Sequence, residues 1–81
     1  MKVRVRFYAQ LRDVTGTDNL DLELPDASTA GTVLERLYIR MPALRSHDRG
    51  ILLGAGVEFV DRNYVIQPNE ELAIMPPVQG G

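Results

Sequence analysis

The sequence predicts an α+β domain in which one helix packs on one face of a four- to five-stranded sheet. Two observations predict this class: apolar and polar residues alternate in several short segments, and one central segment has helical spacing. Because a single helix can cover only one face of such a sheet, we expect the other face to meet water or a partner. The predicted order is two strands, a helix and two strands, with an additional short strand possible.

The first two strands are predicted from alternation with a period of two. The first has an apolar side and a polar side, formed respectively by Val3, Val5 and Phe7 and by Lys2, Arg4, Arg6 and Tyr8. A turn-rich stretch follows at residues 15–18. In the second strand leucines at 20, 22 and 24 alternate with acidic residues until Pro25, which cannot donate a ladder hydrogen bond.

A helix is predicted next, with Ser28 and Thr29 as candidate N-caps. Its apolar positions follow the i, i+3, i+4, i+7 spacing of an amphipathic helix: Ala30, Val33, Leu34, Leu37 and Met41. The helix should end before Pro42, because proline disfavours helical geometry in the residue before it.

The second half of the chain is predicted to contain a loop and the remaining strands. Residues 42–50 are polar and irregular, which predicts a surface loop in which His47 is solvated. Short strands are predicted over residues 51–60 and 64–66 around a turn at 61–63, and a final strand over 72–75.

The composition of the 81 residues excludes several classes of function. Without cysteine the chain has no disulfide, thiolate metal site or cysteine nucleophile, and its single histidine excludes a two-histidine metal cluster. A net charge of −2 has the wrong sign for a general nucleic-acid binder. The longest nearly apolar run, residues 51–57, is far shorter than a bilayer span of about 20 residues. No signal-peptide pattern is seen, so we expect a cytoplasmic protein with no membrane or nucleic-acid partner.

Two charged motifs have simple structural explanations. Lys2, Arg4 and Arg6 form a basic stripe that could steer an acidic protein partner, although a solubilising strand face explains the stripe more simply. The adjacent Glu70 and Glu71 could suggest a catalytic carboxylate pair, but neighbours on an extended chain point to opposite sides. We therefore expect a solvated turn there.

The end of the chain carries the most informative motif, Pro76-Pro77-Val78-Gln79-Gly80-Gly81. The prolines have a fixed φ and no N–H donor, so the last strand must stop and the chain must leave the sheet in an extended form. The six residues can then reach roughly 20 Å. Two final glycines arise by chance in about one chain in two hundred. Because glycine has no Cβ, its carboxylate can enter a narrow channel and offer an unhindered carbonyl carbon to a nucleophile.

This motif divides the chain into a folded domain, residues 1–75, and a flexible Gly-Gly tail, residues 76–81. The alternative interpretation of the tail is a flexible terminus without a function, which is common.

The element order and the terminal motif together resemble the ubiquitin-like β-grasp sulfur carriers of the MoaD and ThiS family, most specifically the small subunits of molybdopterin synthase. Residues 5–12 look like the first strand and following turn of this family. The resemblance implies a β-grasp fold with a mixed sheet. It also implies that an ATP-dependent enzyme adenylates the Gly81 carboxylate and that a sulfur donor protein converts it to a thiocarboxylate. ATP is then a co-substrate of that enzyme, and this chain binds no cofactor.

The resemblance further implies a partner and a docking surface. The tail would enter the large catalytic subunit of molybdopterin synthase and donate sulfur to cyclic pyranopterin monophosphate, in an assembly of two small and two large subunits. The chain would be a carrier rather than a catalyst. The positions that match the family's docking face are Tyr8, Phe59 and Met75. Strand alternation independently puts Tyr8 and Met75 opposite the core, whereas it leaves the side of Phe59 open.

The sequence departs from the family pattern at two turns. Gly56 replaces an asparagine that many members carry after a valine, and residues 68–71, Pro-Asn-Glu-Glu, replace the usual Asp-Gly-Asp-Glu. Both departures concern local turn geometry and leave the tail unchanged. Gly54 and Gly56 lack the lysine and helix that follow a phosphate loop, so we expect a bulge or a close backbone contact.

Other functions remain open at this point. One is a carrier for another pathway, such as thiamine thiazole synthesis or tRNA thiolation. A second is a ubiquitin-like modifier whose Gly81 forms an isopeptide with lysines of target proteins. A third is a passive binding module that uses only the open sheet face.

Overall fold

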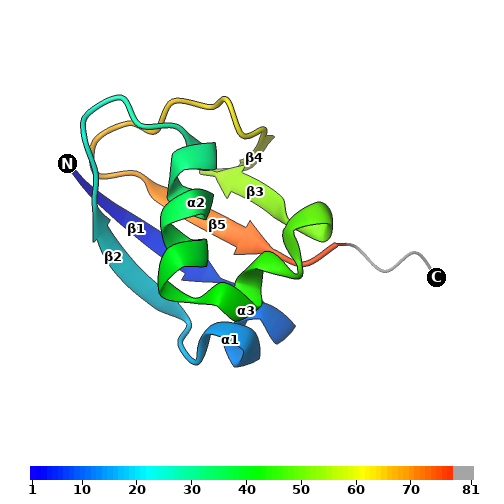
Figure 1. Ribbon diagram of the computed structural model, residues 1–81. Helices are drawn as coiled ribbons and strands as arrows, with labels where there is room; N and C mark the ends of the chain where they lie inside the picture. The colour runs from blue at the N-terminus through cyan, green and yellow to red at the C-terminus, as the bar shows by residue number, and fades with distance from the viewer. Residues whose placement is uncertain (78–81) are drawn as a thin grey trace.

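The alternating N-terminal segment forms an inner strand of a mixed five-stranded sheet (Figure 1). The strands are β1 (Lys2–Phe7), β2 (Asn19–Glu23), β3 (Leu52–Ala55), β4 (Glu58–Val60) and β5 (Glu71–Met75). β1 pairs antiparallel with β2 and parallel with β5, and the order across the sheet is β2-β1-β5-β3-β4. These features come from a computed structural model that describes residues 1–77.

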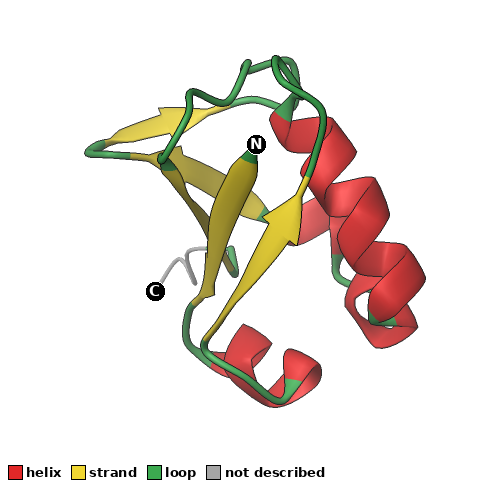
Figure 2. Ribbon diagram, turned by 90° about the vertical axis from the view of Figure 1, so that its left-hand side faces the viewer, coloured by secondary structure: helices red, strands yellow, loops and turns green. Residues whose placement is uncertain are grey.

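Helix α2 (Ala30–Arg40) covers one face of the sheet, so the protein has two layers (Figure 2). Thr29 is the N-cap, because its hydroxyl oxygen accepts a hydrogen bond from the Thr32 N–H at 3.2 Å. The other candidate, Ser28, instead donates its hydroxyl to the Pro25 carbonyl at 2.7 Å. The helix and its end before Pro42 are confirmed.

One apolar core fills the space between α2 and the sheet. Its members come from every strand except β4 and from all the helices, as the buried residues show: Val3, Val5, Phe7, Leu11, Leu22, Leu24, Ala30, Val33, Leu34, Leu37, Tyr38, Leu44, Leu53, Ile66, Leu72 and Ile74. The predicted apolar faces of the first two strands and the helix all contribute. The face of the sheet opposite α2 therefore does not contribute to this core.

Two segments form helices that periodicity did not reveal. Residues 10–12, expected as part of a turn, begin helix α1 (Gln10–Thr15), which ends at Gly16 with φ of 76°. Within residues 42–50, expected as a surface loop, lie helix α3 (Pro42–Arg45) and the 3₁₀ turn η1 (Asp48–Gly50). In both segments one leucine, Leu11 or Leu44, is buried in the core. A single buried residue anchors such a short segment to the core, but one residue produces no periodic pattern in the sequence.

The strand prediction for residues 51–66 was wrong in two ways. Residues 51–60 form a hairpin of β3 and β4 rather than one strand, because Gly56 and Val57 make a two-residue turn with Gly56 at φ of 63°. Residues 64–66 form no named strand and contribute only an isolated bridge, between Val65 and Thr29. This segment still enters the core through Ile66. The final strand was predicted correctly.

Candidate functional site

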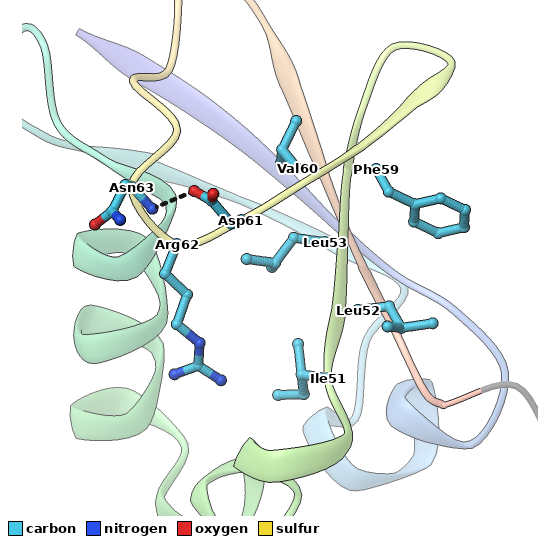
Figure 3. A pocket seen from close by; sticks show the side chains of 8 residues that line it. All are labelled: Ile51, Leu52, Leu53, Phe59, Val60, Asp61, Arg62 and Asn63. Atoms are coloured by element: carbon cyan, nitrogen blue, oxygen red, sulfur yellow. Dashed lines mark hydrogen bonds between the residues drawn. The ribbon is translucent and has the colours of Figure 1, made fainter.

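The sheet face opposite α2 carries an apolar surface that we call the open-face patch, formed by Tyr8, Val57, Phe59 and Met75. The Tyr8 and Phe59 side chains are 41% and 71% exposed, and Val57 is fully exposed at the hairpin turn. Figure 3 shows Phe59 and its neighbour Leu52 on the side of the hairpin away from α2, whereas Leu53 points toward the helix. The structure thus resolves the side of Phe59 that strand alternation left open.

Small residues form the floor of the patch. Gly54, on β3, pairs with Phe59 on β4 and with Ala73 on β5. A Cβ placed on Gly54 would lie 3.0 Å from the Met75 Cε atom, so the Met75 methyl group occupies the space of a side chain. The close contact at Gly54 is thus with a side chain, whereas a bulge or a close backbone contact was expected. The result is a shallow apolar groove between Phe59 and Tyr8, which can accept apolar side chains of a partner.

The basic stripe on β1 is largely neutralised by acidic side chains on neighbouring strands. The Arg4 Nε atom lies 2.9 Å from an Asp21 carboxylate oxygen on β2, and the hydrogen bond lowers the pKa of Asp21. The Arg6 Nε atom lies 3.4 Å from a Glu71 carboxylate oxygen on β5. These contacts favour the solubilising interpretation of the stripe over steering of an acidic partner.

Glu70 and Glu71 face different partners, as expected for neighbours on an extended chain. The Tyr64 hydroxyl donates to the Glu70 carboxylate at 2.7 to 2.8 Å, and the Gln67 N–H donates to it at 3.0 Å. Glu71 instead pairs with Arg6 across the sheet. Asn69, with φ of 64°, completes this turn. Residues 68–71, which depart from the expected family pattern, thus lie in a turn held by local hydrogen bonds.

The base of the tail adjoins the open-face patch. β5 ends at Met75, a patch residue, and the next two residues carry the chain away from the end of the sheet. Pro76 is half-buried and Pro77 is exposed, with its ring close to Gly50 in η1. The remaining predicted site residues, Val78, Gln79, Gly80 and Gly81, lie outside the described residues. A partner bound to the patch would therefore also lie beside the start of the tail.

A hydrogen-bonded cluster centred on Asp48, which we call the Asp48 clamp, lies near this base. The Tyr38 hydroxyl donates to the Asp48 Oδ1 atom at 2.5 Å, and an Arg62 Nη1 group donates to the same oxygen at 2.8 Å. The second Arg62 nitrogen donates to the Asp48 backbone carbonyl at 2.8 Å. The Tyr38 and Arg62 hydrogen bonds lower the pKa of Asp48, while burial and the bond to Asp48 raise the pKa of Tyr38. Figure 3 shows the Arg62 side chain extending toward the α3 and η1 segment.

Sequence reasoning missed the clamp, since its three members lie in three segments and have no motif spacing. It also missed Leu52 and Val57, because residues 51–60 were taken as one strand. The positive-φ preference of Gly56 is the signal that would have separated the two strands.

Within residues 1–77 the acidic and histidine side chains form no cluster of three or more able to hold a metal ion. The helices of the same range are all too short and polar to cross a membrane. His47 is half-buried at the turn before η1 rather than fully solvated.

The sheet order, the covering helix and the end of β5 beside an apolar sheet face together define a ubiquitin-like β-grasp protein. A family model described as the ThiS family matches residues 5–81. The chain belongs to this family. The fold and the resemblance inferred from the sequence are both confirmed.

Curated relatives cover nearly the whole chain. A protein of Arabidopsis thaliana named "Molybdopterin synthase sulfur carrier subunit" is 31% identical over 100% of this chain and 84% of its own length. A protein of the same name from Dictyostelium discoideum is 32% identical, over 96% of this chain and 94% of its own length.

Solved structures agree on the fold. A putative molybdopterin converting factor, subunit 1, from Pyrococcus furiosus has a TM-score of 0.86 at 20% identity, covering 96% of this chain and 99% of its own. SAMP1 from Haloferax volcanii has a TM-score of 0.84 at 24% identity, with both chains fully covered. A complex of subunits 1 and 2 of the molybdopterin-converting factor of Helicobacter pylori contains a chain with a TM-score of 0.71 at 20% identity, again with both chains fully covered.

Proposed function

We propose that this chain is the sulfur carrier subunit of a molybdopterin synthase. The observation that carries the proposal is the Gly80-Gly81 terminus on a chain that leaves the sheet directly beside an exposed apolar patch. Relatives that span the whole chain and bear the name of this subunit support it.

The proposed chemistry takes place on the carboxylate of Gly81. A free carboxylate is a poor electrophile, so an ATP-dependent activating enzyme first forms an acyl-adenylate and releases pyrophosphate. A sulfide-level sulfur nucleophile delivered by a donor protein then attacks the carbonyl carbon, AMP leaves, and a thiocarboxylate remains. The sulfur is thus held on the chain terminus, which is consistent with sulfur chemistry in a protein without cysteine. ATP is a substrate of the activating enzyme, and this chain needs no bound cofactor.

The proposed partner is the large catalytic subunit of molybdopterin synthase. The open-face patch, including Tyr8, Phe59 and Met75, docks on that subunit, and the tail enters its active site to donate sulfur to cyclic pyranopterin monophosphate. The carrier supplies sulfur and the partner supplies catalysis, in an assembly of two small and two large subunits. A complex between two subunits of this kind in Helicobacter pylori supports such a pairing. We place these events in the cytoplasm. A chain without cysteine forms no disulfide, so it does not require an oxidising compartment.

Removal of Gly81 tests the proposal. The shortened tail is about 3.3 Å shorter and no longer places its carboxylate at the activating or accepting centre. We expect an unchanged melting temperature and a complete loss of molybdopterin in a reconstituted synthase. An unchanged yield of molybdopterin would refute the carrier function. Gly81 found instead in amide linkage to lysines of other proteins would favour a ubiquitin-like modifier.

A further inference from the structure

We propose that Gly50 is a positioning residue that forms a seat for Pro77, and that the Asp48 clamp holds this seat so that the tail leaves the domain in a fixed direction. The effect on sulfur transfer rests on the proposed function, whereas the seat itself is a feature of the isolated chain.

The contact between Gly50 and Pro77 leaves little room for a side chain. A Cβ placed on Gly50 would lie 3.0 Å from the Pro77 Cγ atom, 3.1 Å from Cδ and 3.6 Å from Cβ. The first two distances are tighter than nine in ten contacts of real Cβ atoms. An alanine at this position would therefore push the proline ring away by a few tenths of an ångström.

The backbone conformation does not explain a glycine at position 50. Among residues 1–77 the glycines with positive φ are Gly16 and Gly56, at 76° and 63°, and both lie in turns that require it. Gly50 instead ends a 3₁₀ turn in which its N–H donates to the His47 carbonyl at 3.0 Å. The space taken by the Pro77 ring is thus the physical reason for a residue without a Cβ.

The seat is held from two sides by the Asp48 clamp. Asp48 begins η1, two residues before Gly50, and it is bonded to Tyr38 on α2 and to Arg62 in the segment after β4. The guanidinium group of Arg45, in α3, lies 5.0 Å from the centre of the Tyr38 ring. The clamp thereby ties η1 to the helix layer.

A fixed exit direction matters for a tail that must enter a partner. Met75 lies in the open-face patch, and Pro77 is only two residues further along the chain. A partner docked on the patch therefore finds the start of the tail at a defined position. Residues that are already ordered lose less conformational freedom on binding, which favours productive insertion.

The test is a double-mutant cycle between Gly50 and Pro77 in the full chain. Gly50→Ala should slow sulfur transfer from the preloaded thiocarboxylate about tenfold in the complex with the large subunit. In a Pro77→Gly background, where the ring is absent, adding Gly50→Ala should change the rate less than twofold. Ser46→Ala is the matched control, because Ser46 is exposed in the same segment and its hydroxyl donates only locally, to the Ala43 carbonyl. It should leave the rate unchanged.

Two readouts separate a positioning role from a loss of stability. Gly50→Ala should change the dissociation constant for the large subunit less than twofold. The slowing should appear instead in the transfer rate, measured at a saturating concentration of the large subunit. In the isolated wild-type chain, nuclear Overhauser contacts should connect the Gly50 Hα protons with the Pro77 ring protons, and Gly50→Ala should weaken these contacts and shift the resonances of the ring.

Three results would overturn the inference or its basis. Absence of the Overhauser contacts in the wild type would exclude the seat, whatever the activity. Equal slowing by Gly50→Ala with and without the proline ring, or no slowing at all, would exclude the positioning role. A wild-type chain that never forms a thiocarboxylate would overturn the proposed function and the transfer role with it, and the Overhauser contacts would still decide the seat.

Discussion

At the scale of single residues, Asp48 links three parts of the chain through one carboxylate. It accepts hydrogen bonds from Tyr38 in α2 and from Arg62 after β4, and both bonds favour its ionised form. The side chains of Asp48 and Arg62 are 39% and 43% exposed, so water screens their attraction. The clamp therefore contributes more to the placement of η1 than to the total stability.

The clamp predicts a dependence of stability on pH. The pKa of Asp48 is lower in the folded protein than its ordinary value of 3.8, so its contribution is present above about pH 4 and is lost as the pH falls through the folded-state value. Asp48→Asn should reduce the free energy of unfolding by about 1 kcal/mol at pH 7. Urea titrations from pH 7 to pH 2 should show this difference shrinking toward the acid end. A difference that grows on acidification would contradict the assignment.

The open-face patch predicts a specific loss of binding. Phe59→Asp places an unpaired charge in a contact that loses water when the partner docks, so affinity for the large subunit should fall at least about tenfold. Ile39→Asp is the matched control, because Ile39 is an apolar residue of α2 that is 75% exposed on the other side of the molecule. Calorimetry should show near-normal affinity for this control. Equal losses of affinity in both variants would show that Phe59 is not part of the interface.

At the scale of elements, the sequence predicted those segments whose apolar spacing is long enough to show a period. β1, β2 and α2 have such spacing, and all three form as expected. α1 and α3 are six and four residues long, with one buried leucine each, and such segments have no measurable period. They form because tertiary packing orders them, which a local pattern cannot reveal.

The candidate site was predicted in part for the same reason. Alternation along β1 and β5 placed Tyr8 and Met75 opposite the core, where the structure has them. Phe59 could not be placed because the turn at Gly56 resets the alternation between β3 and β4. The clamp and the Gly50 seat depend on contacts between distant segments, and no spacing in the sequence encodes them.

The β3–β4 hairpin predicts a graded response at Gly56. Its φ of 63° is strained for a branched side chain, so Gly56→Val should lower the free energy of unfolding by about 1–2 kcal/mol. Gly56→Asn should cost less, because asparagine adopts a positive φ more readily than valine. Urea denaturation of the two variants measures the difference. Equal stability of both variants would show that the turn adopts another conformation.

At the scale of the whole molecule, the two faces of the sheet have different roles. α2 lies on one side of the sheet (Figure 2), where it and the core side of the sheet provide stability. The opposite side carries the open-face patch. The parallel pairing of β1 with β5 brings Tyr8 beside the end of β5, since the Tyr8 N–H donates to the Ile74 carbonyl at 3.1 Å. The fold thereby places residues from both ends of the chain at the base of the tail.

If the C-terminal carboxylate carries sulfur, the intact mass of the protein must reveal it. The protein is isolated from its native cells and measured before and after incubation with the activating enzyme, ATP and a sulfur donor. The account predicts a mass change equal to the replacement of one oxygen by sulfur, localised by fragmentation to Gly81. An unchanged mass, under conditions that convert an established carrier, would contradict it.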